Sequence, residues 1–180
     1  MIDKQALRAH LRATRDAFVA ANPPPITVPE EFRARLSHGQ TISSYVPIGS
    51  EADPSPLARA ATEAGCVLAL PHITARSEPM RFLAWETEAA LEAGPFGLSQ
   101  PAADAIELRP DIILTPLVAF DAKLDRLGQG AGYYDRAFAR FPEAWRVGVA
   151  WSCQQVADLP IEPWDISLHA VVTEQGWITR

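Results

Sequence analysis

The chain of 180 residues is 48% hydrophobic and 21% charged, a composition typical of globular proteins that excludes a largely disordered chain. Its length suits one ordinary domain, so residues 1–180 are predicted to form a single domain with a substantial core. The formal net charge of −6 argues against general affinity for nucleic acid or an anionic membrane, so any anionic ligand needs a local cluster of donors.

Signals for membranes and for metal-binding cysteines or histidines are weak. Nowhere do about eighteen apolar residues follow one another, and the first residues run directly into a charged helical pattern without a stretch of the signal-peptide type. Cys66 and Cys153 are expected to be reduced and partly buried, and the four histidines are expected at the surface or in loops. We therefore predict a cytoplasmic protein that binds no membrane and no nucleic acid, and we expect a monomer.

Capping residues and apolar periodicity place the helices. Asp3 is a good N-cap, Pro29 suits a helix start, and Gly39 and Gly65 suit positions just past helix ends. The expected helices cover approximately residues 3–20, 29–39, 53–65 and 133–140.

Apolar runs between these helices predict strands. The run at residues 66–70 is continuously apolar, as expected for a strand covered on both faces. The expected strands cover residues 41–46, 66–70, 80–85, 111–115, 147–151, 168–173 and 177–179. This interleaving predicts an α/β three-layer sandwich around a mostly parallel sheet, Rossmann-like and similar to the folds of sugar-phosphate isomerases and CoA transferases.

In such folds ligands collect at the carboxyl ends of the strands. The loops that should share this face follow Val46, Leu70, Thr115 and Trp151.

The strongest local signal is a glycine-rich segment, residues 126–135, with the sequence Arg-Leu-Gly-Gln-Gly-Ala-Gly-Tyr-Tyr-Asp. Glycines at positions 128, 130 and 132 allow several backbone N–H groups to converge on one point at the start of a helix, which favours an anion. Arg126 is expected to add a charge-assisted contact to phosphate oxygens, and Asp135 is placed to hold a divalent ion. The spacing matches neither a Walker A loop nor the Rossmann fingerprint, and a flexible glycine-rich turn is the alternative.

This segment resembles the Arg-Leu-Gly-x-Gly-x-Gly-Tyr-Tyr-Asp motif of the 5-formyltetrahydrofolate cyclo-ligase family. Pro116, Ala119, Phe120 and Asp121 supply the Pro-x-x-Ala-Phe-Asp segment that precedes it in the family. The resemblance extends over nearly the whole chain in order and spacing. Its other segments are Lys4-x-x-x-Arg8, Tyr45-x-Pro47 with Glu51, Gly97-x-x-x-Pro101, and a tail from Gly148 to Glu174.

The resemblance implies a ligase that uses ATP as co-substrate and Mg²⁺ as cofactor. ATP would phosphorylate the formyl oxygen of 5-formyltetrahydrofolate, and a folate nitrogen would then close the ring to give 5,10-methenyltetrahydrofolate, ADP and phosphate. The implied ATP-binding residues are Lys4, Arg8, Arg126, Leu127, Gly128, Gln129, Gly130, Ala131, Gly132, Tyr133 and Tyr134. The implied folate-binding residues are Glu51, Gln129, Gly130, Ala131, Gly132 and Tyr133. The implied metal ligands are Asp135 and Asp165.

A basic stripe on the first helix has two interpretations. Lys4, Arg8, Arg12 and Arg15 recur at helical spacing and therefore share one face. For Arg12 and Arg15 a solvated basic face is the favoured interpretation. For Lys4 and Arg8 the resemblance favours phosphate binding.

Other candidates also keep a structural alternative. Glu51 can accept hydrogen bonds from a ligand or be an ordinary exposed loop glutamate. Asp165 can serve the site or form a local turn. Trp85 and Phe96 are favoured as core residues over partners of an aromatic ligand ring.

Four positions depart from the family pattern and keep other functions open. Leu124 stands where Gly is usual, Gln129 where Arg is common, Ala131 where Gly or Lys is common, and His169 where Asp is frequent. These departures are consistent with a non-catalytic relative that binds nucleotide or folate. A sugar-phosphate isomerase or an acyl transferase is a further alternative, because one fold serves many chemistries.

Overall fold

The structure, a computed structural model, describes residues 4–180, so the N-cap predicted at Asp3 lies outside the described residues. The helices are α1 (Lys4–Ala20), α2 (Glu30–Arg33), α3 (Ser55–Glu63) and α4 (Tyr133–Arg140), with short 3₁₀ turns η1 (Pro95–Gly97) and η2 (Ser152–Gln154). None of the helices in residues 4–180 combines the length and apolar character that crossing a membrane requires.

Within residues 4–180, seven strands form a central sheet in the order β11-β10-β9-β6-β1-β2-β3. These strands are β1 (Thr41–Ser43), β2 (Val67–His72), β3 (Arg81–Ala84), β6 (Ile112–Pro116), β9 (Trp145–Val149), β10 (Ala170–Thr173) and β11 (Gly176–Thr179). Two small antiparallel pairs accompany them: β4 (Glu92–Ala93) with β5 (Ser99–Gln100), and β7 (Ala119–Phe120) with β8 (Arg126–Leu127).

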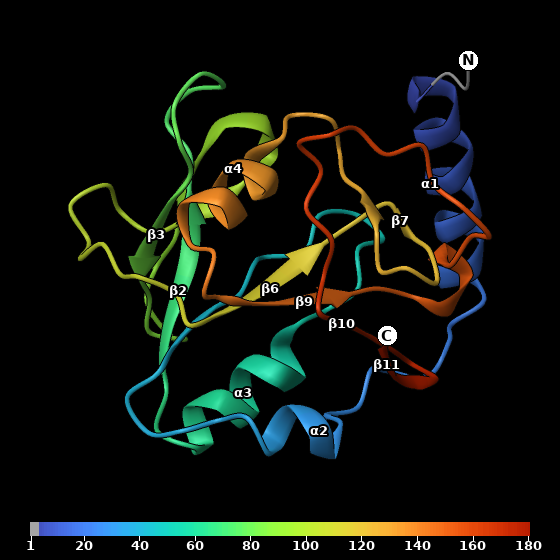
Figure 1. Cartoon of the computed structure of the whole chain (residues 1–180). Coiled ribbons are helices and arrows are strands. Elements are labelled where there is room, and N and C mark those ends of the chain that lie inside the picture. The colour runs from blue at the N-terminus through green and yellow to red at the C-terminus, as the bar shows by residue number, and fades with distance from the viewer. Residues whose placement is uncertain (1–3) are drawn as a thin grey trace.

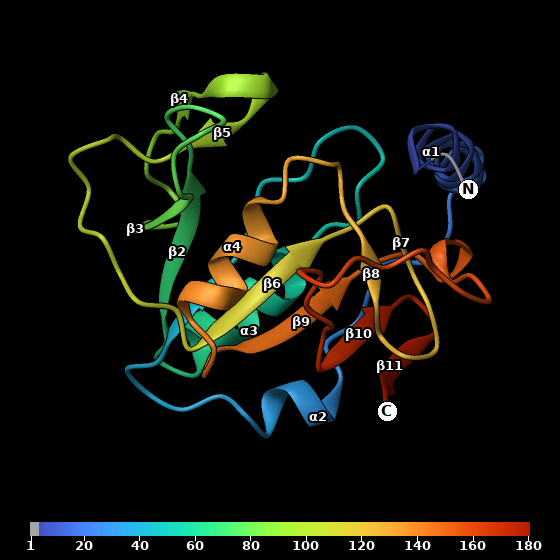
Figure 2. The same ribbon diagram turned by 45° about the horizontal axis from the view of Figure 1, so that its top comes forward.

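The sheet is parallel except at its two edges. β2, β1, β6, β9 and β10 pair parallel in turn, whereas the edge strands β3 and β11 pair antiparallel with their neighbours. The carboxyl ends of the five parallel strands therefore lie at one edge of the sheet, as predicted. In Figures 1 and 2 the arrow of β6 points toward α1, which stands beyond this edge.

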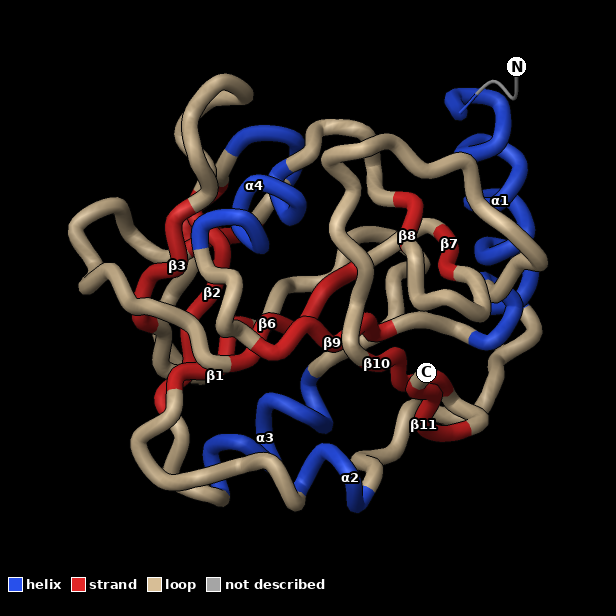
Figure 3. The backbone as a smooth tube through the Cα atoms, viewed as in Figure 1, coloured by secondary structure: helices blue, strands red, loops and turns tan. Residues whose placement is uncertain are grey.

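Helices cover both faces of the sheet, which confirms the predicted α/β sandwich (Figures 1 and 3). Side chains alternate along each strand, so β6 sends Leu114 to one face and Ile113 to the other. Leu114 packs in the cluster with Phe32 of α2 and Leu57 of α3, whereas Ile113 packs in the cluster with Phe138 of α4. Each such fully buried side chain contributes on the order of 1.5–3 kcal/mol through removal of apolar surface from water.

Most predicted elements are present with different ends. β1 ends at Ser43 rather than at residue 46, because the N–H of Ser44 makes the last bond to β2, at 2.9 Å from the Ala69 oxygen. The second helix covers Glu30–Arg33 only, whereas residues 29–39 were expected. The short pairs β4–β5 and β7–β8 were not predicted.

His72 contradicts the expectation that the histidines lie at the surface or in loops. It is the last residue of β2 and is only 5% exposed, because the strand carries it under the neighbouring chain segments.

A close approach of several segments requires a glycine in β9. A Cβ at Gly148 would lie 2.7 Å from Leu168 Cδ1, 2.9 Å from Leu117 Cδ2 and 3.0 Å from Val171 Cγ2. These distances are below ordinary contact, so the side chains of the two flanking segments occupy the space that a side chain at 148 would need.

Candidate functional site

The glycine loop, residues 128–132, connects β8 to the start of α4. Gly130 and Gly132 have φ values of 103° and 68°, in the left-handed region that L side chains rarely adopt. Gly132 is the N-cap of α4 and offers no capping side chain, so the first N–H groups of this helix are left for another acceptor. The loop therefore has the backbone geometry of an anion-binding turn at the positive end of a helix.

Helix α1 lies against this loop. The Arg8 Nε donates to the Gly128 oxygen at 2.8 Å, and the Arg8 guanidinium carbon would lie 3.3 Å from a Cβ at Gly130. Arg12 donates through Nε and a terminal nitrogen to the Gln129 Oε1, at 3.0 and 2.5 Å. The structure thus brings the predicted Arg8 to the glycine loop and adds Arg12, which the solvated-face interpretation had assigned to solvent.

Lys4 lies near the C-terminal segment that carries Asp165. Its Nζ is 3.3 Å from the Glu162 Oε1 and 3.6 Å from the Asp165 Oδ2. The same Asp165 oxygen accepts the N–H of Glu162 at 2.7 Å, so this carboxylate also closes a local turn. Asp165 therefore forms the local turn that was the alternative to a role in the site. It also lies beside Lys4, a predicted ATP-binding residue.

Arg126 is paired with Asp135 inside the protein. Both terminal nitrogens of Arg126 donate to the Asp135 Oδ1, at 3.1 and 2.9 Å, and the guanidinium lies 4.8 Å from the centre of the Phe138 ring. Burial lowers the pKa of Arg126, and the charges of Asp135 and Asp165 oppose this effect. With its side chain only 4% exposed, Arg126 holds Asp135 in place in this arrangement.

Of the two predicted metal ligands, Asp135 has the chemistry of a Mg²⁺ ligand, whereas Asp165 already accepts the N–H of Glu162 and lies beside Lys4. Among residues 4–180, no group of three or more His, Cys, Asp or Glu side chains is placed to hold a metal ion. Mg²⁺ in nucleotide sites is commonly held by one or two carboxylates together with substrate phosphates and water, so a full protein cage is not required. Within residues 4–180 the hydrogen bonds to Asp135 go to Oδ1, from Arg126 and from the N–H of Ile166 at 3.3 Å, so Oδ2 is the oxygen that suits a cation.

Glu51 meets the glycine loop from the segment after β1. Its Oε1 accepts from the Gln129 Nε2 at 3.2 Å, and its Oε2 accepts the N–H of Ile48 at 3.0 Å. The loop, α1 and the segment after β1 are therefore joined through the one side chain of Gln129.

The two tyrosines at the start of α4 differ in environment. The Tyr133 hydroxyl donates to the Ala75 oxygen at 3.3 Å, and the Arg136 guanidinium lies 5.0 Å from the centre of its ring. Burial raises the pKa of Tyr134 well above its ordinary value, and the nearby charge of Glu51 raises it further. Tyr134 is therefore a neutral hydroxyl at physiological pH.

The two aromatic residues that were expected in the core, Trp85 and Phe96, lie in different environments. Trp85 is half-buried, packs against the core cluster on the α3 face, and lines a cavity of about 490 Å³ with Tyr45 and Arg59. Phe96 is 65% exposed and has a φ of 60°, because it lies in the turn between β4 and β5 rather than under the sheet. The core expectation for Phe96 was wrong.

Arg15 is a further residue that the solvated-face interpretation missed. It is only 5% exposed, and its Nε donates to the Ser50 Oγ at 2.9 Å. A terminal nitrogen of Arg15 lies 3.4 Å from the Leu117 oxygen. The helical spacing from Lys4 and Arg8 to Arg12 and Arg15 was the available signal, since all four side chains share the face that meets the ligand edge.

The residues that depart from the family pattern have defined surroundings in the structure. Leu124 has a φ of 60°, in the left-handed region, yet it is fully buried in the core cluster on the α4 face. The Ala131 oxygen accepts from Arg136 at 3.0 Å, and His169 contacts Arg146 through both ring nitrogens. Leu124 therefore packs in the core and does not seal the glycine loop.

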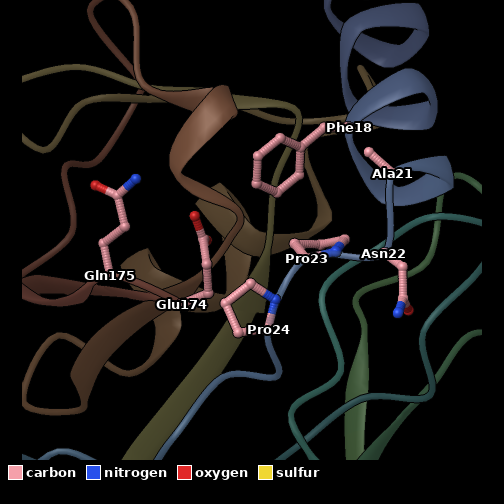
Figure 4. Close-up of a pocket in the computed structure, with 7 residues that line it drawn as sticks. All are labelled: Phe18, Ala21, Asn22, Pro23, Pro24, Glu174 and Gln175. Atoms are coloured by element: carbon pink, nitrogen blue, oxygen red, sulfur yellow. The ribbon is translucent and has the colours of Figure 1, made fainter.

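A separate cavity of about 480 Å³ lies at the C-terminal end of α1 (Figure 4). Phe18, Pro23 and Pro24 face Glu174 and Gln175 across it. None of the predicted site residues lines this cavity. The contacts described above place those residues instead near the N-terminal part of α1 and the glycine loop.

Comparison with known proteins identifies the family. The family described as the 5-formyltetrahydrofolate cyclo-ligase family matches residues 1–174. The chain belongs to this family. A 5-formyltetrahydrofolate cyclo-ligase from Escherichia coli K12 is 35% identical over 140 residues, which cover 74% of this chain and 77% of the relative. One from Mycolicibacterium smegmatis is 32% identical over 150 residues, covering 78% and 76%.

Solved structures of cyclo-ligases, under the name 5,10-methenyltetrahydrofolate synthetase, share the fold. The Aquifex aeolicus protein has a TM-score of 0.65 and 29% identity, covering 99% of this chain and 84% of its own. The Mycoplasma pneumoniae protein has a TM-score of 0.67, covering 96% of this chain and 99% of its own; at 21% identity this match concerns the fold alone.

Proposed function

We propose that this chain catalyses the ATP- and Mg²⁺-dependent cyclisation of 5-formyltetrahydrofolate to 5,10-methenyltetrahydrofolate, with release of ADP and phosphate. The observation that carries the proposal is the glycine loop at the start of α4, against which α1 places Arg8 and Arg12. An acidic protein with a net charge of −6 concentrates cationic groups at one backbone anion site. Membership of the cyclo-ligase family supplies the reaction that fits this site.

The chemical problem is a poor leaving group. Ring closure must expel the formyl oxygen, so this oxygen first needs activation by transfer of the terminal phosphoryl group of ATP. Phosphoryl transfer depends mainly on positioning and on neutralisation of charge, so it needs no protein nucleophile. The folate nitrogen then attacks the activated carbon and phosphate leaves.

The residues divide this work between the two substrates. The N–H groups of the glycine loop and the side chains of Lys4 and Arg8 hold the triphosphate. Glu51 accepts hydrogen bonds from the folate on the opposite side of Gln129. Tyr133 and the backbone of residues 129–132 border both substrates, which brings the formyl oxygen within reach of the terminal phosphate.

Asp135 and Asp165 would hold the Mg²⁺ beside the phosphates. A Mg²⁺ ion bound there supplies neutralisation of the charge on the phosphate oxygens. Arg126 orients Asp135 through the buried ion pair, so its role is to fix a carboxylate that the phosphates face.

One coupled assay tests the proposal. Purified protein is mixed with 5-formyltetrahydrofolate, ATP and Mg²⁺, and the near-ultraviolet absorbance of the methenyl product is followed. The expected result is product formation that requires both ATP and Mg²⁺. Binding of both ligands without product would favour the non-catalytic relative, and no binding of ATP in the presence of Mg²⁺ would favour an isomerase or acyl transferase.

A further inference from the structure

Two guanidinium groups of α1 contact the glycine loop through neutral acceptors. Arg8 donates to the Gly128 oxygen, and Arg12 donates to the side-chain oxygen of Gln129. In the ion pairs of residues 4–180 neither arginine has a carboxylate partner within 4.0 Å. Helix α1 therefore brings two positive charges to the loop, and no carboxylate of the described residues forms an ion pair with either.

The other two cations of the site differ in this respect. Lys4 is paired with Glu162 and Asp165, and Arg126 is paired with Asp135. Their charges are already balanced by neighbouring carboxylates.

Arg136 of α4 also lacks a carboxylate partner among the ion pairs of residues 4–180, and it donates to the Ala131 oxygen of the loop at 3.0 Å. The uncompensated positive charge at the glycine loop therefore comes from Arg8, Arg12 and Arg136. Of these three, Arg12 is the one that Gln129 joins to Glu51.

Gln129 fixes where the Arg12 guanidinium lies. Because a guanidinium only donates, the amide oxygen of Gln129 faces Arg12 and its NH₂ faces the Glu51 Oε1, at 3.2 Å. An amide engaged at both ends has one orientation. Arg12 is thus held at the side of the loop that faces Glu51. Among the described residues its contacts use two of its five N–H donors, so the other three can donate to a ligand.

We propose that Arg12 binds the terminal phosphoryl group of ATP and that Gln129 is its positioning residue. This inference rests on the proposed function, in which Glu51 marks the folate side of the site. The transferred phosphoryl group must lie between the folate and the glycine loop, and Arg12 is the uncompensated cation that Gln129 ties to that side. Arg8, bonded to the Gly128 oxygen, is left to the inner phosphates.

Calorimetric titration with nucleotides tests this assignment directly. Arg12→Ala is expected to weaken binding of MgATP by about tenfold, the low end for a charge-assisted hydrogen bond because the side chain is half-buried. Binding of ADP is expected to stay unchanged, because ADP lacks the terminal phosphoryl group. An equal loss for ATP and ADP would overturn the assignment to that group, and unchanged ATP binding would overturn any contact.

A double variant that moves the positive charge from α1 to the loop tests whether ATP binding can be restored. In Arg12→Ala combined with Gln129→Arg, the guanidinium returns to the same rim from the loop itself, and ATP binding is expected to recover most of the loss. Without recovery, the Arg12 effect would be attributed to lost packing of α1, and the inference would fail. Thermal unfolding of each variant establishes that it is folded.

Arg33→Ala supplies the matched control, because Arg33 is an exposed arginine on α2, which covers the sheet face away from α4. It is expected to bind ATP as the unaltered protein does.

A protein that binds ATP in the Arg12-dependent manner but forms no methenyl product would support the inference while overturning the proposed function. Product formation unaffected by Arg12→Ala at limiting ATP would overturn the inference alone, and failure of the unaltered protein to bind ATP would overturn both.

Discussion

Asp135 has two roles that substitutions can separate. Its Oδ1 holds the buried Arg126, and its charge is needed for the proposed Mg²⁺ site. Asp135→Asn keeps an oxygen for Arg126 but removes the charge, so Mg²⁺-dependent product formation is expected to fall by about a hundredfold, the upper end of the range for groups that surround a metal ion. Rates measured over a range of Mg²⁺ concentrations check this, and an Asn variant with unaltered rates would remove Asp135 from the metal site.

Asp135→Ala tests the structural role of the same carboxylate. It leaves the Arg126 guanidinium buried without its partner, so the free energy of unfolding is expected to fall by about 3 kcal/mol, which is the low end for breaking a buried pair. The low end applies because Asp135 is 18% exposed and Asp165 also lies near Arg126. Urea unfolding of the Ala and Asn variants compares the two, and equal stability would contradict the structural role.

From the surroundings of His169 we expect the free energy of unfolding to depend on pH. Its Nδ1 accepts the N–H of Arg146 at 3.0 Å, and burial lowers its pKa below the ordinary 6.5, with the charge of Arg146 adding to the effect. As pH falls from about 6.5, the unfolded chain takes up a proton before the folded one does, so stability present above that pH is lost. Because the burial of His169 is only partial and much of the residue stays exposed to water, the loss is expected to stay below about 1 kcal/mol.

The variant His169→Asp places a carboxylate beside Arg146. The stability lost on acidification should then move to pH below about 4, where a carboxylate takes up its proton. Urea unfolding at pH 7.5 and 5.5 measures both proteins. The same loss in the Asp variant as in the original protein would show that His169 is not the group responsible.

In the turn between β7 and β8, backbone strain at Leu124 lowers the stability of the fold and burial of the Leu124 side chain raises it. Leu124 has a φ of 60°, which costs about 1–2 kcal/mol for a residue with a side chain, and it is fully buried. Removing a buried leucine side chain costs about 2–5 kcal/mol. Leu124→Gly is therefore expected to lower the free energy of unfolding by about 2 kcal/mol, although Gly is the usual residue of the family here.

Thermal and urea unfolding of Leu124→Gly check this balance. Leu124→Ala, which keeps the strain and loses most of the side chain, is expected to be less stable still. A glycine variant more stable than the original protein would show that strain outweighs packing at this turn.

Sequence periodicity predicts the helices and strands that are long enough to show a repeating pattern of apolar residues. The five parallel strands and α1, α3 and α4 were expected close to where they lie. β7 and β8 have two residues each, too few for an alternation to be seen. The end of β1 depends on which amide last finds a partner on β2, which the continuing sequence toward Tyr45 and Val46 does not reveal.

Across the whole molecule, α1 is the element whose attachment the proposed nucleotide would strengthen. Leu11 packs in a small cluster with Leu127 and Leu159, whereas Phe18 and Val19, near the C-terminal end of the helix, pack against the large cluster on the α3 face. Bound ATP would add charged contacts from Lys4 and Arg8 at the N-terminal half of α1, where the apolar contact is the small cluster. We expect amide hydrogen exchange in α1 to slow by about tenfold or more when MgATP binds.

Exchange followed by mass spectrometry resolves α1 from the central strands. Peptides from β6 are expected to change little, because β6 is already held in the core. Leu11→Ala should speed exchange in α1 without nucleotide, since a buried leucine is lost. Equal slowing in α1 and β6 would indicate general stabilisation instead.

The candidate site was predictable where it is local and not where it joins distant segments. Alternating glycines before a helix are visible in the sequence, and the structure gives Gly130 and Gly132 the expected backbone conformation. The contact of Arg12 with Gln129 spans 117 positions, and that of Arg15 with Ser50 spans 35. Such pairs follow from the packing of α1 on the sheet, so the sequence alone left these arginines in solvent.

The absent side chain at Gly148 has a consequence for how this enzyme family member can change over evolution. The space beside that backbone is already filled by Leu117 and Leu168. Leu117 also offers its oxygen to Arg15, and the N–H of Leu168 bonds to Leu124, so even one added methyl would press on both connections at once. A side chain at position 148 would have to displace Leu117, Leu168 and Val171 together, so an isolated Gly148→Ala is accommodated only if the segments on both sides of β9 move with it.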